Sequence, residues 1–226
     1  MNVSVLIPVY NKALVISRVI GAVLTQLNSE DEVVALDDGS SDNSFNELNQ
    51  YPIKVLQRQH ETVAFRLASA RNFLVEHASK DYLIFLSGDC VPHANFIALH
   101  KEAAQTVRSK TLVRGVVYEN GNPIIGPIDG YSQEWEKFIT GNLGLKKKDF
   151  YAIGGFDENF DGEWGGEDTE FGYRALKVHG YNIFGIDAAV DHMPHKNEAK
   201  DRYMRKHINN LKIRNQAYFR EKHGLE

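Results

Sequence analysis

The stretch VSVLIPVYNKALVISRVIGAVLTQLNSEDEVVALDDGSSD (residues 3–42) decides the fold class. Residues 3–9 are rich in apolar and β-branched side chains, which is typical of a buried strand. Residues 12–27 carry apolar side chains at helical spacing, and residues 31–36 form a second apolar run that stops in a turn-rich segment. This order of strand, helix and strand predicts the first unit of an α/β sheet.

The alternation of strands and helices continues to about residue 110. Two further apolar runs and two further helical patterns follow in turn, at residues 53–56, 63–78, 82–86 and 92–107. These four strands and three helices predict an α/β domain with a mainly parallel central sheet flanked by helices. Beyond residue 112 the pattern becomes irregular, and it ends with a strand at residues 183–186 and a polar helix at residues 198–222.

The composition bounds the class of protein. With 226 residues, 42% hydrophobic and 25% charged, the chain fits one globular domain with its own core. A net charge of -4 gives no reason to expect a nucleic-acid partner. The single cysteine, Cys90, leaves no intrachain disulfide and fits a reducing compartment. Since no apolar run is long enough to cross a bilayer, we expect a cytoplasmic protein with at most peripheral contact at the inner face of a membrane.

Polar side chains follow the predicted strands at the sheet edge where α/β proteins bind their ligands. They are Tyr10 and Asn11, then Asp37 and Asp38, then Ser87, Gly88 and Asp89. Asp38 could accept hydrogen bonds from a nucleoside, as an acid at a strand end does for ribose. A turn with an Asx cap on the next helix fits the same residues. The phosphate-binding loops GxGxxG and GxxxxGK[ST] are absent from these positions.

Asp89 is a candidate metal ligand. A buried carboxylate after a central strand needs a partner, because an unpaired buried charge is costly. A divalent cation would serve, and two histidines, His192 and His195, follow the last predicted strand. One aspartate with one or two histidines and a diphosphate suits Mn²⁺ better than Ca²⁺. Two histidines alone are more often structural, so the metal hypothesis depends on their combination with Asp89.

Arg66 and Arg71 are candidate phosphate ligands on the third predicted helix. Positions five apart on a helix differ by about 140° of rotation. We therefore expect one of them to face a phosphate and the other to tie the helix to its neighbours.

The segment GGFDENFDGEWGGEDTEFGYR (residues 154–174) combines acidic, glycine and aromatic residues. Glu167 and Asp168 would lie at a helix start, where acidic side chains are favourable. The simple interpretation is a cluster of capping residues on a surface helix. The functional one is a pocket for a polar ring, with an acid placed for proton transfer.

The ordered motifs VLIPVYN, LDDGSSD, ASARN and FLSGDC resemble those of family 2 glycosyltransferases with the GT-A fold. The segment GNLGLKKKDFYAIGGFDENFDGEWGGEDTEFGYR resembles the C-terminal region of family 7 type galactosyltransferases, a pattern shared by chondroitin-synthase-like transferases. The resemblance covers about residues 3–196. It implies one GT-A domain with a mixed, mainly parallel sheet, divided into a nucleotide-sugar half (1–110), an acceptor and catalytic half (111–196) and a C-terminal helix (197–226).

The resemblance also implies site residues. The donor site would comprise Pro8, Tyr10, Asp38, Arg66, Arg71, Gly88 and Asp89. The metal, Mn²⁺ rather than Mg²⁺, would be held by Asp89, His195 and His192. Asp168 would be the catalytic base with Glu167 beside it, Trp164 would stack on a sugar, and Asn142 would lie on the pocket wall. Ser87 replaces the first acid of the family's DxD motif, so the site has one carboxylate fewer. Asp157, Glu158 and Asp161 are expected to do no chemistry.

The implied reaction is an inverting transfer from a UDP-sugar, of galactose or N-acetylgalactosamine type, to a saccharide hydroxyl in surface polysaccharide synthesis. The acceptor would be a saccharide, lipid-linked by family analogy. A nucleotidyltransferase that makes sugar nucleotides is one alternative, although VLIPVYNK lacks the glycine- and arginine-rich loop expected there. A non-catalytic nucleotide-sugar-binding protein is another. The basic C-terminal helix is interpreted as a solvated face, or alternatively as contacting an acidic acceptor or a membrane.

Overall fold

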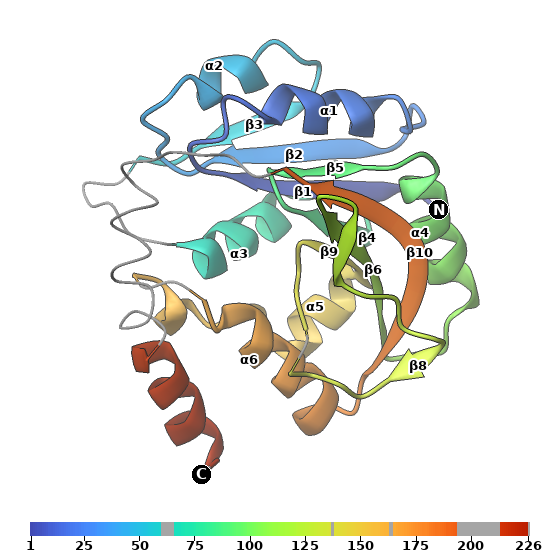
Figure 1. The fold of residues 1–226 in the computed structure, drawn as a ribbon, viewed down its shortest axis with the longest axis vertical. Coiled ribbons are helices and arrows are strands. Elements are labelled where there is room, and N and C mark those ends of the chain that lie inside the picture. The colour runs from blue at the N-terminus through green and yellow to red at the C-terminus, as the bar shows by residue number, and fades with distance from the viewer. Residues whose placement is uncertain (60–65, 137, 163–164, 194–212, 226) are drawn as a thin grey trace.

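The computed structural model describes residues 1–59, 66–136, 138–162, 165–193 and 213–225. Within them, one mixed sheet has the strand order β3-β2-β1-β4-β9-β6-β10-β5, with β7 paired to β6 and β8 to β10 (Figure 1). The strands are β1 (Val3–Val9), β2 (Glu32–Asp37), β3 (Lys54–Gln57), β4 (Tyr82–Leu86), β5 (Cys90–Pro92), β6 (Thr111–Glu119), β7 (Asn122–Ile125), β8 (Tyr131–Ser132), β9 (Asn142–Lys146) and β10 (Asn182–His192).

Helices cover both faces of this sheet. They are α1 (Ile16–Leu24), α2 (Ser44–Leu48), α3 (Leu67–His77), α4 (Phe96–Thr106), α5 (Lys147–Ile153), η1 (Glu158–Phe160), α6 (Glu167–Tyr173) and its π-helical continuation η2 (Arg174–Val178), followed by a helical segment at residues 213–223. In Figure 1, α1 and α2 lie on one side of the strands, and α3, α5 and α6 lie on the other.

The two-residue period of the strands explains this layering. In β1, Val5 and Ile7 belong to the core cluster that contains α1 and α4, whereas Leu6 belongs to the cluster that contains α3, α5 and α6. Successive side chains of a strand point to opposite faces. A continuous apolar run is therefore what a strand covered on both faces requires.

The expected mixed sheet is confirmed, and its parallel pairs lie mostly in the N-terminal half. β1 pairs in parallel with β2 and β4, and β2 pairs in parallel with β3. The sheet is mixed beyond this half, because β9 runs antiparallel between β4 and β6. β9 contains Gly144, where a Cβ atom would clash with the Tyr82 hydroxyl and the His100 ring. A short strand interrupted by glycine has little apolar pattern, which explains why the sequence did not predict it.

Several element bounds differ from expectation. β1 and β4 have the predicted bounds, whereas α1 begins at Ile16 because residues 12–15 form turns. α4 begins at Phe96, since Cys90–Pro92 pairs with β10 as a strand. β10 extends well past the predicted residues 183–186, and α2 was not predicted. The expected C-terminal helix is described only from residue 213 onward. No helix in the described ranges is long and apolar enough to span a bilayer.

Candidate functional site

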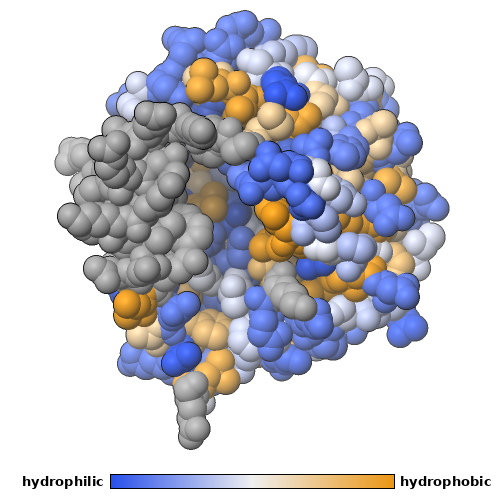
Figure 2. Space-filling model, in the orientation of Figure 1, coloured by the Kyte–Doolittle hydropathy of each residue, from blue (hydrophilic) through white to orange (hydrophobic). Residues whose placement is uncertain are grey.

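Two cavities meet at the carboxyl ends of β1 and β4. The larger has a volume of about 740 Å³ and the smaller about 230 Å³. Leu67, Ser87 and Asp89 line both of them. The face drawn in Figure 2 is hollowed near its middle, and hydrophobic and hydrophilic residues are both visible in the hollow. One ligand could thus reach from the smaller cavity past Asp89 into the larger one.

The smaller cavity contains most of the predicted donor residues. Pro8, Tyr10, Asp38, Arg66, Gly88 and Asp89 all line it. Gly88 allows two chain segments to approach closely, because a Cβ atom there would lie 2.9 Å from the Pro8 carbonyl oxygen. The ends of three strands therefore converge here, as the rule for ligand sites in α/β sheets predicts.

Asp38 holds two arginines at the rim of the smaller cavity. Its Oδ1 accepts hydrogen bonds from Arg58 Nε at 2.8 Å and from Arg66 Nη2 at 3.0 Å. Asp37 is fully buried beside it, and burial raises the pKa of its carboxyl group. Arg58 was not predicted, although its place directly after β3 at the same sheet edge was an available signal. Two guanidinium groups on one carboxylate leave an excess of positive charge near the cavity.

Asp89 faces a cation of the protein itself. Lys12 Nζ lies 2.6 Å from Asp89 Oδ2, and His192 Nε2 lies 3.7 Å from the same oxygen. Burial opposes ionisation of Asp89, but the contacts with His192 and Lys12 outweigh it and hold the pKa of this carboxyl well below its usual range. The expectation that Asp89 needs a positive partner is thus confirmed, and Lys12 is a partner that the sequence did not reveal.

The donor types around Asp89 fit a divalent metal ion. His192 shares a 2.7 Å hydrogen bond between its Nδ1 and Glu119 Oε1, so its Nε2 is turned toward Asp89. Metal-binding histidines are typically oriented by such a carboxylate. Across the ranges that the structure describes, no three His, Cys, Asp or Glu side chains form a metal cluster. His195 lies outside these ranges.

Arg71 contacts the carboxylates of Glu167 and Asp168 instead of facing the smaller cavity. Its side chain is buried, and its Nη1 lies 2.8 Å from Asp168 Oδ1 and 3.1 Å from Glu167 Oε1. Of the two arginines considered, Arg66 therefore lines the predicted donor cavity and Arg71 ties α3 to the start of α6. The two side chains do point to different places, but Arg66 is the N-cap of α3 with a non-helical backbone, so the angle between two positions of one helix does not account for the difference.

Glu167 and Asp168 lie in the first turn of α6 and line the larger cavity. Burial and the neighbouring charge of Asp168 raise the pKa of Glu167 to about 7, against the effect of Arg71. Asp168 is more accessible, with 23% of its side chain exposed, and it also accepts a short hydrogen bond from the Thr140 hydroxyl. A carboxylate that is fixed by two donors and still reaches a cavity is suited to accept a proton from a ligand.

The turn before these acids requires glycine. Gly166 has a φ of 102°, and a Cβ atom there would lie 2.9 Å from the ring of Phe160. Asp161, in the same segment, accepts hydrogen bonds from the backbone N–H groups of Ala68 and Ser69 at 3.0 and 3.1 Å. It therefore caps α3 and joins the acidic segment to the helix that carries Arg71.

The structure corrects the expectation for Asn142. This residue is fully buried: its Oδ1 contacts His100 Nε2 at 3.0 Å, and its Nδ2 donates to the carbonyls of Val116 and Ala188. Every polar atom of the amide is thus used inside the sheet, and the neighbouring Gly141 lines the larger cavity in its place. Trp164, the predicted stacking residue, lies outside the described residues.

Two family models match the chain. That of glycosyl transferase family 2 matches residues 4–156. A second, described as the N-terminal domain of galactosyltransferase, matches residues 128–207. The second match includes Glu167 and Asp168 of the larger cavity, and the first includes the residues that line the smaller cavity.

Curated relatives match most of the chain. It is 30% identical over 257 residues to validoxylamine A glucosyltransferase of Streptomyces hygroscopicus subsp. jinggangensis, covering 90% of this chain and 60% of that protein. It is 23% identical over 275 residues to chondroitin synthase of Escherichia coli, covering 100% of this chain and 40% of that protein. The chain therefore spans less than two thirds of the length of either relative.

Solved structures share the fold. TarS residues 1–349 of S. aureus, in complex with UDP-GlcNAc, superposes with a TM-score of 0.74 at 17% identity, over 88% of this chain and 60% of that one. GalNAc-T7 with UDP, GalNAc and Mn²⁺ gives a TM-score of 0.69 at 18% identity, over 100% of this chain and 55% of that one. The fold expected from the sequence motifs, the GT-A type, is confirmed.

Proposed function

Because this chain belongs to glycosyl transferase family 2, we propose that it is a glycosyltransferase that moves a sugar from a UDP-sugar to a hydroxyl of a saccharide acceptor. The observation that carries the proposal is the meeting of the two cavities at Asp89. A nucleotide in the smaller cavity would place its diphosphate at that point and its sugar toward Asp168.

The smaller cavity is proposed to bind the nucleotide. Pro8, Tyr10 and Asp38 would contact the uridine, and Gly88 would let the diphosphate approach the backbone. Arg66 and Lys12 would offset the charge of the phosphates, since both line this cavity. Arginine binds phosphate well through its planar fork of donors, and lysine does so as a point charge.

Asp89 and His192 are proposed to hold a divalent metal, Mn²⁺ rather than Mg²⁺, together with His195. An imidazole ligand beside a carboxylate favours Mn²⁺ over Mg²⁺, which prefers oxygen ligands and retained waters. GalNAc-T7 is solved with Mn²⁺, which supports the same choice here. When bound, the ion would neutralise charge that develops on the leaving diphosphate. Lys12 would then turn from Asp89 to the phosphate oxygens.

Asp168 is proposed as the base of an inverting transfer. It would take the proton of the acceptor hydroxyl while that oxygen attacks the anomeric carbon from the face opposite UDP. The bond between that carbon and the diphosphate oxygen breaks, and UDP leaves with the electron pair. Arg71 and Thr140 would hold the carboxylate in position, and Glu167, whose pKa is raised to about 7, would form a hydrogen bond with a sugar hydroxyl.

The sugar and the acceptor are finer proposals. The match to the N-terminal domain of galactosyltransferase at residues 128–207 favours galactose or N-acetylgalactosamine as the transferred sugar. Chondroitin synthase among the relatives supports a role in polysaccharide synthesis. We assign the donor to residues 1–110 and the acceptor to residues 111–196. A lipid-linked acceptor would bring the reaction to the cytoplasmic face of a membrane.

The test is release of UDP from a panel of UDP-sugars, with saccharide acceptors and with or without Mn²⁺. The proposal expects acceptor- and Mn²⁺-stimulated UDP release from one donor, and a product whose anomeric configuration, read from NMR coupling constants, is inverted. Release of pyrophosphate would instead indicate a nucleotidyltransferase. Tight binding of UDP-sugars without turnover would indicate a non-catalytic binding protein.

A further inference from the structure

We infer that the helix of residues 213–223 forms a wall of the acceptor site, where Gln216 and Phe219 contact a sugar of the acceptor. This inference rests on the proposed function and deepens it. Asn215, Gln216 and Phe219 line the larger cavity, which Glu167 and Asp168 also line. The helix lies beyond residues 128–207, where the second family model ends.

The spacing of these residues places them on one face of the helix. Positions i and i+4 lie above one another on a helix surface, and position i+3 is close to them. Asn215 and Phe219 are four apart, and Gln216 and Phe219 are three apart. Asn215 is buried, whereas Gln216 is exposed and Phe219 half-buried. The last two are therefore accessible to a ligand, and Asn215 fixes the helix in place.

Asn215 joins the helix to the turn that precedes the catalytic acids. Its Nδ2 donates to the carbonyls of Gly165 at 2.6 Å and Phe160 at 3.2 Å. Gly165 stands two residues before Glu167. Movement of the helix would therefore move the turn that directly precedes Glu167 and Asp168.

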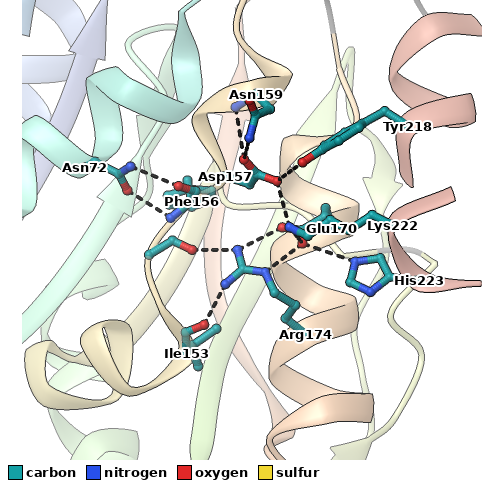
Figure 3. Close-up of polar contacts among 11 residues, drawn as sticks. Asn72, Ile153, Phe156, Asp157, Asn159, Glu170, Arg174, Tyr218, Lys222 and His223 are labelled. Atoms are coloured by element: carbon teal, nitrogen blue, oxygen red, sulfur yellow. Dashed lines mark hydrogen bonds and ion pairs between the residues drawn. The ribbon is translucent and has the colours of Figure 1, made fainter. Parts of the chain in front are cut away.

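The same helix is also fixed by a cluster of polar contacts that we call the clamp: Asp157, Glu170, Tyr218, Lys222 and His223 (Figure 3). Lys222 Nζ lies 2.7 Å from both Asp157 Oδ2 and Glu170 Oε1. Tyr218 donates to Asp157 Oδ2 at 2.8 Å, and His223 Nε2 lies 3.2 Å from Glu170 Oε1. Glu170 is fully buried on α6, so the clamp attaches the helix to the element that carries Asp168.

Neighbouring aromatic rings hold the Phe219 side chain. Its ring centroid lies 5.5 Å from that of Trp135 and 5.4 Å from that of Tyr173, with an interplanar angle of 87° to the latter. These are the separations of packed aromatic pairs. A fixed ring offers a flat apolar surface to the C–H face of a pyranose. The Gln216 amide has both donors and acceptors for sugar hydroxyls.

The chemistry of this wall indicates an uncharged or weakly charged saccharide. Ligand pockets typically combine apolar side chains, which bury the surface of the ligand, with a few polar groups that fix its orientation. Phe219 and the neutral amide of Gln216 provide this combination. Asp161 and Glu136 also line the cavity, which disfavours a strongly anionic acceptor at this position.

The experiment compares wild type with Gln216→Ala, Phe219→Ala and the control Arg220→Ala. Arg220 is exposed on the same helix and does not line the cavity. Acceptor kcat/KM, donor KM, UDP-sugar hydrolysis without acceptor and Tm are measured for each. We expect acceptor kcat/KM to fall at least about tenfold in the two cavity variants, the size of effect that a lost pocket contact gives. Donor KM and acceptor-free hydrolysis should stay within about twofold, and the control should match wild type.

Two outcomes would overturn the inference, and they are distinct from a failure of the proposed function. Unchanged acceptor kcat/KM in both cavity variants would remove the helix from the acceptor site while leaving the glycosyltransferase intact. Equal losses in acceptor transfer and in acceptor-free hydrolysis would make the helix structural only. A wild-type protein that transfers no sugar would contradict the proposed function itself. If Phe219→Ala lowers Tm, the inference is judged on Gln216→Ala, because Gln216 is exposed and its loss should not destabilise the fold.

Discussion

Arg71 Nη1 lies 2.8 Å from Asp168 Oδ1, and the same nitrogen lies 3.1 Å from Glu167 Oε1. One buried cation thus faces two adjacent acids from a helix more than ninety residues away in the sequence. Burial raises the pKa of Glu167, and the neighbouring charge of Asp168 raises it further, because a single positive charge does not compensate two carboxylates. The arrangement links α3, which borders both cavities, to the first turn of α6.

The first prediction concerns stability. Arg71→Met leaves Glu167 and Asp168 without their buried cation, and breaking a buried pair in this way costs about 3–5 kcal/mol. Urea unfolding monitored by circular dichroism should show that loss. The control Arg66→Met should cost about 1 kcal/mol or less, because Asp38 keeps Arg58. If Arg71→Met unfolds at the wild-type urea concentration, the ion pairs do not support the fold.

The second prediction is the pH dependence of stability caused by Glu167. In the folded protein the pKa of Glu167 is raised to about 7, whereas the unfolded chain releases this proton near the usual value of 4.5. Between pH 4.5 and about pH 7 the folded state therefore binds more protons than the unfolded state. The contribution of Glu167 to stability is full below pH 4.5 and declines as the pH rises toward 7. Glu167→Gln removes that decline. The difference in Tm between variant and wild type should grow in favour of the variant from pH 4.5 to 7. A constant difference would contradict the raised pKa.

The third prediction concerns the metal. Glu119→Gln weakens the contact that orients His192, and loss of such an outer partner typically lowers metal affinity by about 10–100-fold. Mn²⁺ binding measured by electron paramagnetic resonance, without substrates, should show this loss. The control is Asp191→Asn, which neighbours His192 on β10 and forms an exposed pair with His93, a residue outside that strand. This variant should bind Mn²⁺ as wild type does. Equal affinities in all three proteins would remove Glu119 and His192 from the site.

The fourth prediction tests the internal role of Asn142. Asn142→Ala leaves the carbonyls of Val116 and Ala188 and the ring of His100 without their buried partner. An unsatisfied buried polar group costs about 1–3 kcal/mol, so Tm should fall. Acceptor KM should stay at the wild-type value. A raised acceptor KM with unchanged Tm would return Asn142 to the pocket wall.

Much of the N-terminal half could be predicted from the sequence, because its strands are covered on both faces. Such strands are continuous apolar runs, and their bounds in β1 and β4 follow directly. The convergence of Tyr10, Asp38 and Asp89 on one cavity followed from the parallel order of the strands. The start of α6 at Glu167 followed from the acids in its first turn.

The partners of the site residues could not be predicted. Lys12 lies 77 positions from Asp89, and Glu119 lies 73 from His192, so only tertiary structure brings each pair together. Asn142 was misplaced for a related reason. β9 was not recognised as a strand. The side of the sheet to which the Asn142 side chain points could therefore not be predicted from the alternation of side chains along a strand. The contact of the C-terminal helix with the turn before Glu167 was not predicted, because the basic residues of the helix suggested a solvated face.

The measurement that tests the central claim most directly is sugar transfer by Asp168→Asn, with UDP binding measured by calorimetry on the same protein. Asparagine keeps the size of the side chain but cannot take the acceptor proton, and loss of a general base typically costs about 10²–10⁴-fold in rate. We predict a loss in kcat of that size with the wild-type affinity for UDP. Transfer by this variant at close to the wild-type rate would contradict the assignment of Asp168 as the base.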